Sequence, residues 1–86
     1  MPELSRFFGI VITMYFRDHP PPHFHARYGE HEGKFSIENG TLIAGKLPRR
    51  IIALVQEWQG RHIEELRVAW NAIQSREPFD RIEPLE

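Results

Sequence analysis

Histidines are the residues in this 86-residue chain whose spacing offers chemistry, because four of the five fall between positions 19 and 31. His23 and His25 stand two residues apart, and residues i and i+2 of a β-strand project from the same face. Both imidazoles could therefore reach one divalent transition metal ion, with His19 or His31 as a third ligand from a neighbouring loop. The spacing matches no standard zinc motif. We therefore favour the competing interpretation, in which the histidines hydrogen-bond around the proline run 20–22, fix its shape and need no cofactor.

A second constellation contains the groups that metal-free ribonucleases use as base, acid and phosphate clamp. Its members are Tyr15, Arg17, His23, His25 and Arg27, with Lys34 close by in the sequence. They converge only if the odd-numbered face of the first strand lies on the same side of the sheet as the two histidines. Acidic residues interrupt the positive field, so the sequence favours an ordinary solvated sheet face and makes an enzyme the lesser alternative.

Basic residues around the start of the expected helix form a third candidate site, for a phosphate or for a partner. They are Lys46, Arg49, Arg50 and Arg61. Residues 46–61 carry four basic residues against one acidic residue, a balance of +3, whereas residues 62–86 carry three against six, a balance of −3. The acidic second half would repel DNA, which leaves nucleic-acid binding uncertain. The opposite balances suit a small protein partner or self-association.

The overall composition excludes several classes of protein. With 41% hydrophobic residues and a net charge of −1, the chain is typical of a globular protein and has no long-range field that gathers phosphates. The absence of cysteine removes disulfides, thiolate zinc sites and cysteine nucleophiles. There is neither a signal peptide nor an apolar run long enough to span a membrane, so we expect a cytoplasmic protein with no membrane partner. The length suits one domain, residues 1–86.

The elements that must position these side chains follow from hydrophobic periodicity. Apolar residues of both parities predict a buried strand at 7–16, and alternation predicts strands at 23–28, 34–38 and 41–44. Asn39-Gly40 predicts a two-residue type I′ turn, because both residues tolerate positive φ. That turn would place Phe35 opposite Ala44.

The second half of the chain has helical periodicity. Pro48 suits the first turn of a helix, and apolar residues at helical spacing predict helical structure over 48–75, with a break or kink near Gly60 and an extended tail at 76–86. Trp58 and Trp70 fall on the apolar stripe and are expected in the core. The sequence therefore predicts an α+β fold, with an antiparallel sheet of about four strands followed by one kinked or two consecutive helices packed on one face.

Several segments of the chain carry a resemblance to a known family: SRFFGIVITMYFRDH, PPHFHARYGE, GKLPRRIIALVQEW and EPFDRIEPL. Together they resemble the bacterial family called domain of unknown function 4160, over essentially the whole chain. The resemblance implies a small intracellular α+β protein with no established activity and no catalytic residue to carry over. Genes of this family often lie beside those of another small family, an arrangement that resembles toxin–antitoxin modules. We therefore expect a protein-interaction component of a toxin–antitoxin-like or regulatory gene pair, with the neighbouring gene product as its partner.

Overall fold

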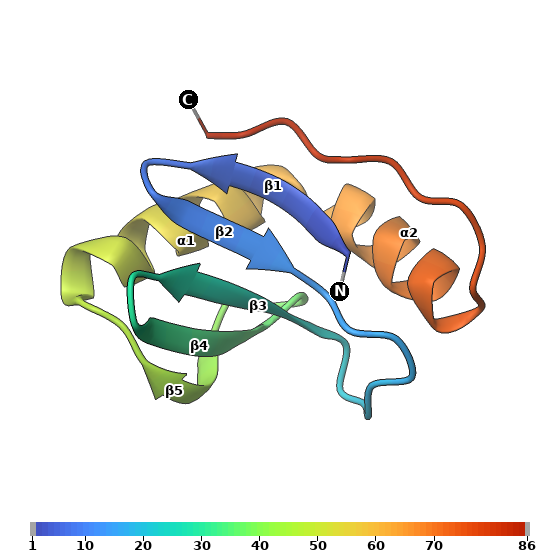
Figure 1. Cartoon of the computed structure of the whole chain (residues 1–86), viewed down its shortest axis with the longest axis horizontal. Helices are drawn as coiled ribbons and strands as arrows, with labels where there is room; N and C mark the ends of the chain where they lie inside the picture. Colours follow the sequence, from blue (N-terminus) through green and yellow to red (C-terminus); the bar gives the residue numbers. More distant parts are fainter. Residues whose placement is uncertain (1, 86) are drawn as a thin grey trace.

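The computed structural model describes residues 2–85 and has a five-stranded antiparallel sheet followed by two helices (Figure 1). The strands are β1 (Glu3–Phe7), β2 (Ile10–Thr13), β3 (His23–Tyr28), β4 (His31–Ser36) and β5 (Leu42–Lys46), and the helices are α1 (Arg49–Arg61) and α2 (Ile63–Gln74). Each strand pairs with the next one along the chain. The α+β class with helices after the sheet is confirmed, with five strands where about four were expected.

The first part of the sheet is a hairpin, so the single strand predicted at 7–16 is wrong. Phe8 and Gly9 have φ values of 51° and 79°, and Phe7 pairs with Ile10 across them, which is a two-residue turn. The hairpin turn divides the apolar run, and the residues after position 13 leave the sheet as a loop. The prediction failed because only Gly9 of the turn pair is a common turn residue, while Phe8 is an apolar residue at positive φ and continues the apolar run.

The strands on either side of Asn39-Gly40 also differ from the prediction. β4 begins at His31, earlier than the predicted 34–38, and Phe35 pairs with Leu42 rather than Ala44, so the predicted register is wrong. The cause is a tertiary contact, because the Ile37 carbonyl accepts a hydrogen bond of 2.6 Å from the buried Gln59 side chain of α1. This contact draws the chain out of the ladder after Ser36, and the two-residue turn becomes a longer loop.

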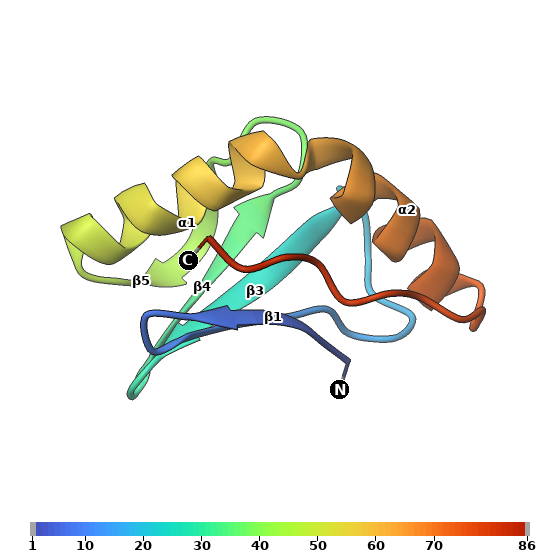
Figure 2. The ribbon, with the colours of Figure 1, turned by 90° about the horizontal axis from the view of Figure 1, so that it is seen from above.

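Both helices cover one face of the sheet (Figure 2). The break falls at His62, whose φ of −131° and ψ of 28° are not helical, so Gly60 itself lies inside α1 and the predicted break is displaced by two residues. In the part of the chain from residue 2 to residue 85, no helix combines the length and the hydropathy that crossing a membrane requires.

The core lies between the helices and the sheet. Trp58 is fully buried and contacts the rings of Phe7 and Phe24 at centroid distances of 5.6 and 5.7 Å. Trp70 is 9% exposed, so both tryptophans are core residues as expected. The residues after α2 run as the predicted extended tail, of which residue 86 lies outside the described part, and the Ile82 amide donates to the Leu4 carbonyl. The tail therefore bonds to β1 and closes one side of the core.

Candidate functional site

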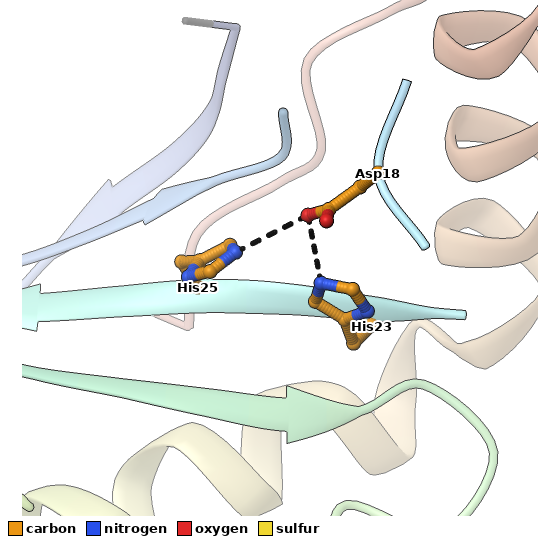
Figure 3. A group of neighbouring side chains, drawn as sticks. All are labelled: Asp18, His23 and His25. Carbon is orange, nitrogen blue, oxygen red and sulfur yellow. Dashed lines mark hydrogen bonds and ion pairs between the residues drawn. The ribbon is translucent and has the colours of Figure 1, made fainter. Parts of the chain in front are cut away.

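Three chemically active side chains converge at the start of β3: Asp18, His23 and His25 (Figure 3). Asp18 Oδ2 lies 2.8 Å from His23 Nε2 and 3.5 Å from His25 Nε2. One ligand atom from each of the three residues lies within 4.8 Å of the other two. We call these three residues the Asp18 cluster.

The two histidines reach the cluster because of strand alternation. His23 and His25 project from one face of β3, while Phe24 and Ala26 project from the other face and are fully buried in the core. His25 pairs across the sheet with Thr13 of β2 and Lys34 of β4, so neighbouring strands flank it on both sides. A central strand thus holds both imidazoles on backbone that the sheet itself orders.

Asp18 comes from the loop between β2 and β3, and the last residue of α2 holds that loop in place. That last residue is Gln74. The backbone amide of Asp18 donates to Gln74 Oε1 at 2.9 Å, and Gln74 Nε2 donates to the Tyr15 carbonyl at 3.2 Å. One side-chain amide therefore satisfies a donor and an acceptor of the same loop. The C-terminal helix thereby positions a carboxylate that lies more than fifty residues earlier in the chain.

Both histidine rings are oriented in the same way. His23 Nδ1 lies 2.7 Å from the Pro21 carbonyl oxygen, and His25 Nδ1 lies 3.2 Å from Glu32 Oε2, so each Nδ1 faces an oxygen acceptor. An imidazole that keeps its proton on Nδ1 carries its lone pair on Nε2. Both Nε2 atoms are directed at Asp18. Metal-ligating histidines have the same outer-shell support, with one ring nitrogen on an oxygen acceptor and the other directed at the ion.

The electrostatics of the cluster favour an ionised carboxylate. Burial acts to raise the pKa of Asp18, but hydrogen bonds from the His19 amide and the His23 ring, together with the nearby His25 ring, outweigh it and lower the pKa overall. Both nitrogens of the buried His23 ring face oxygen atoms, Nδ1 the Pro21 carbonyl and Nε2 the Asp18 carboxylate. His25 Nε2, by contrast, is buried and has no hydrogen-bond partner within the described residues. Such a buried nitrogen calls for an explanation.

Aromatic rings surround the cluster. The Tyr15 ring stacks on His25 with centroids 4.1 Å apart, and its hydroxyl donates to Glu32 Oε2 at 3.2 Å. Burial, and then the charge of Glu32, raise the pKa of Tyr15, so the hydroxyl stays protonated at neutral pH. On the other side, Trp70 of α2 lies 5.3 Å from the His23 ring. These contacts restrict the rotation of both imidazoles.

The third member of the cluster differs from the metal ligands that the sequence suggested. His19 contributes its backbone amide to Asp18, but its ring is not part of the converging group, and neither is His31, which pairs with Tyr28 at the far end of the hairpin. Sequence reasoning treated Asp18 only as a charge that interrupts a basic surface. The signal was present nonetheless, because an acidic residue precedes the His-x-His pair by a few positions in a proline-rich loop.

The residues considered for metal-free RNA cleavage are only partly together. Tyr15, His23 and His25 meet in the cluster, and the charge of Arg27 is near enough to act on the Tyr15 hydroxyl. Arg17 is exposed on the loop. Carboxylates rather than cations face the imidazole nitrogens, so a phosphate would meet negative charge there. The arrangement does not favour a phosphate clamp.

The basic residues near the helix start form a patch of three plus one separate residue. Lys46, Arg49 and Arg50 are exposed where β5 leads into α1, and Arg50 donates to the Tyr28 hydroxyl at 3.2 Å. Arg61 lies at the opposite end of the 13-residue helix and pairs with Glu57 at 2.8 Å. A single ligand at the N-terminus of α1 therefore does not contact all four of the basic residues that the sequence suggested.

Comparison with known proteins identifies the family. A family model described as "Domain of unknown function (DUF4160)" matches residues 9–71, which is most of the chain. The chain belongs to this family. No curated protein and no solved structure matches it. The matched segment contains the Asp18 cluster and Glu32 but ends before Gln74.

Proposed function

We propose that this DUF4160 protein binds a divalent transition metal ion through Asp18 Oδ2, His23 Nε2 and His25 Nε2. The observation that carries the proposal is the shared orientation of the two rings, each with Nδ1 on an oxygen acceptor and Nε2 towards the same carboxylate. Two imidazole nitrogens and one carboxylate oxygen suit zinc and its first-row neighbours. A bound ion also gives the buried His25 Nε2 the partner that it otherwise lacks.

Three protein ligands leave one position of a tetrahedral ion for water or a ligand. The side chains of His23 and His25 are 1% and 12% exposed, whereas that of Asp18 is 20% exposed, so Asp18 is the ligand that solvent reaches most easily. A metal there lowers the pKa of its water, which is the chemistry that hydrolytic sites use.

Metal binding is coupled to a proton. A proton carried by His23 Nε2, which lies 2.8 Å from Asp18 Oδ2, must leave before the nitrogen becomes a ligand. Because protons compete with the metal for the ligand atoms, the affinity for metal should fall as the pH is lowered. Zinc titrations of the same protein at two pH values measure this coupling.

The test is zinc binding by tag-free protein, measured by calorimetry or by competition with a chromophoric chelator. We expect one ion per chain, and we expect His25→Ala to weaken binding by more than the ~10–100-fold that outer-shell changes cost. His31→Ala is the matched control, since it makes the same change on the next strand outside the cluster. Equal affinity in the two variants would place the ion elsewhere, and no binding by the parent protein would refute the proposal. Parallel titrations with nickel and manganese rank the metals.

A second candidate function is a protein-interaction component of a toxin–antitoxin-like or regulatory gene pair. It is supported by an exposed apolar side chain, Val68, which is 66% exposed on α2 between acidic residues. Co-expression with the neighbouring gene product tests it, with stoichiometric co-purification as the expected result. A chain that purifies alone and shows no affinity for that product would contradict this function.

A further inference from the structure

A groove lies between α2 and the tail that follows it. Figure 2 shows the path of this tail after α2. Its cavity volume is about 250 Å³, and its lining residues are Glu64, Glu65, Val68, Ala69, Phe79, Asp80, Arg81 and Ile82. It is distinct from the Asp18 cluster, with which it shares no residue.

The groove has an apolar surface. Val68 is the most exposed of the large hydrophobic side chains at 66%, and Phe79 is only partly buried against the core. Folding gains nothing from leaving a branched aliphatic side chain in water, and exposed apolar surface with a polar rim is typical of interaction sites. Val68 and Phe79 therefore offer apolar surface that an inserted apolar side chain can contact.

The rim of the groove is acidic. It carries the carboxylates of Glu64, Glu65 and Asp80, of which Glu64 pairs with Arg67 at 2.8 Å and Glu65 pairs with His62. The cationic lining residue Arg81 is bound to Glu3 at 2.8 Å, so these four carboxylates outnumber the two arginines and leave a net negative charge. Within residues 2–85 Asp80 makes no ion pair. A partner that approaches this rim is favoured if its own flanking residues are basic.

The two edges of the sheet are poorer docking surfaces than the groove. The tail hydrogen-bonds to β1 through the Ile82 amide and the Leu4 carbonyl. At the opposite edge, β5 contains a bulge at Ile43, and Gly45 has a φ of 87°. Bulges and short edge strands are devices that discourage strand addition.

We propose that this groove binds a segment of a partner protein that inserts an aliphatic or aromatic side chain over Val68 and flanks it with lysine or arginine. The inference rests on the second candidate function and names its surface. A second copy of this chain fits less well, because its own basic patch, at Lys46 and Arg49, lies at the opposite end of the molecule from α2 (Figure 1). A second copy would therefore have to lie antiparallel along the whole molecule to place its basic patch at the groove, whereas a short partner segment needs only the groove itself.

The experiment measures fluorescence polarisation of a labelled synthetic amphipathic peptide of about 12 residues, three helical turns, with leucines on one face and lysines on the other. Val68→Glu should weaken its binding at least tenfold, about 1.4 kcal/mol, while Val68→Leu should retain it. A purely electrostatic association would instead bind Val68→Glu as well or better, because that variant gains a negative charge. Val68 is exposed, so neither substitution disturbs the core.

Three results would overturn the groove proposal. They are no binding of the peptide to the parent protein, undiminished binding to Val68→Glu, and a homodimer in sedimentation velocity that Val68→Glu dissolves, which would make a second copy the occupant. Co-purification separates this proposal from the function on which it rests. If the neighbouring gene product binds the parent protein and Val68→Glu equally, the function stands and the groove is wrong. If it binds neither, the function fails, and the peptide assay alone decides the groove.

Discussion

The two faces of β3 use the same alternation for opposite purposes. Phe24 and Ala26 face the helices and are fully buried among apolar side chains, whereas His23 and His25 face a carboxylate, a carbonyl and a tyrosine. Apolar packing depends on area and volume and is indifferent to pH. Hydrogen bonds and ionised groups depend on direction and on protonation. The core face therefore accounts for stability, and the cluster face for chemistry.

The largest effect should come from the core face. Trp58→Ala removes a fully buried side chain that packs on Phe7 and Phe24 and whose Nε1 donates to the Glu83 carbonyl at 2.8 Å. We expect a loss of about 3–5 kcal/mol in the free energy of unfolding, measured by urea denaturation. The exposed Val68→Ala is the control, with an effect of about 0.5 kcal/mol or less. A loss below about 1 kcal/mol at Trp58 would contradict the assignment of stability to the core face.

On the cluster face, the ion itself should have the next largest effect. A ligand that binds only the folded state adds about 2.7 kcal/mol at a hundred times its Kd. For a domain of this size, each 1 kcal/mol raises the Tm by about 4–8 °C. Zinc should therefore raise the Tm of the parent protein and of His31→Ala, but not that of His25→Ala. A similar rise in all three proteins would argue against the cluster as the site.

The next prediction separates the ionic pair from simple packing. His23→Phe leaves the Asp18 carboxylate and the Pro21 carbonyl without their donor, which should cost about 1–3 kcal/mol. The double variant Asp18→Leu/His23→Phe should recover part of that loss while abolishing metal binding, because two apolar partners leave no buried charge. Denaturation of the two variants at neutral pH checks this. A double variant that is less stable than His23→Phe would contradict this prediction. It would show that the Asp18 carboxylate stabilises the fold through contacts other than the one with His23.

A smaller effect is expected at the residue that positions the loop. Gln74→Leu removes the amide that bonds the Asp18 amide and the Tyr15 carbonyl, at a cost of about 1 kcal/mol in unfolding. Its effect on zinc affinity should be a loss of about tenfold, as expected when an outer-shell support is removed. Gln56→Leu, which removes a side-chain bond to the Gly40 carbonyl away from the cluster, is the control and should leave zinc affinity unchanged. Equal zinc affinity in Gln74→Leu would show that the loop holds Asp18 without the helix.

The most restricted effect concerns acid. Because the folded state lowers the pKa of Asp18, the unfolded chain binds more protons as the pH falls. The stability that this carboxylate contributes is therefore complete above its unfolded pKa of about 3.9 and is lost as the pH falls through the folded value. Asp18→Asn should reduce the slope of stability against pH below about pH 4 without abolishing it, since Glu3 and Glu38 also have lowered pKa values. Denaturation curves at several acidic pH values measure the slope, with the exposed Asp80→Asn as control. An unchanged slope in Asp18→Asn would contradict the carboxylate's role.

Local patterns predicted the parts of this protein that local backbone geometry decides. The alternation at 23–28 predicts that His23 and His25 share one face of a strand, and the apolar spacing after Pro48 predicts helical structure with a break near its middle. Both follow from the fixed periods of strand and helix, which depend on neighbours a few residues apart. The α+β class was accessible for the same reason, whereas the family was accessible from the resemblance of several sequence segments.

Only the tertiary structure decided which residues complete the site. Asp18 reaches the two imidazoles because Gln74 holds its loop, and the register after Ser36 follows from the bond of Gln59 to Ile37. These contacts join residues 22 to 56 positions apart, and no period in the sequence encodes them. The sequence alone determined that two histidines point the same way. The packing of α2 against the loop determined that they meet a carboxylate, since buried polar groups take their partners from whichever segments the fold brings together.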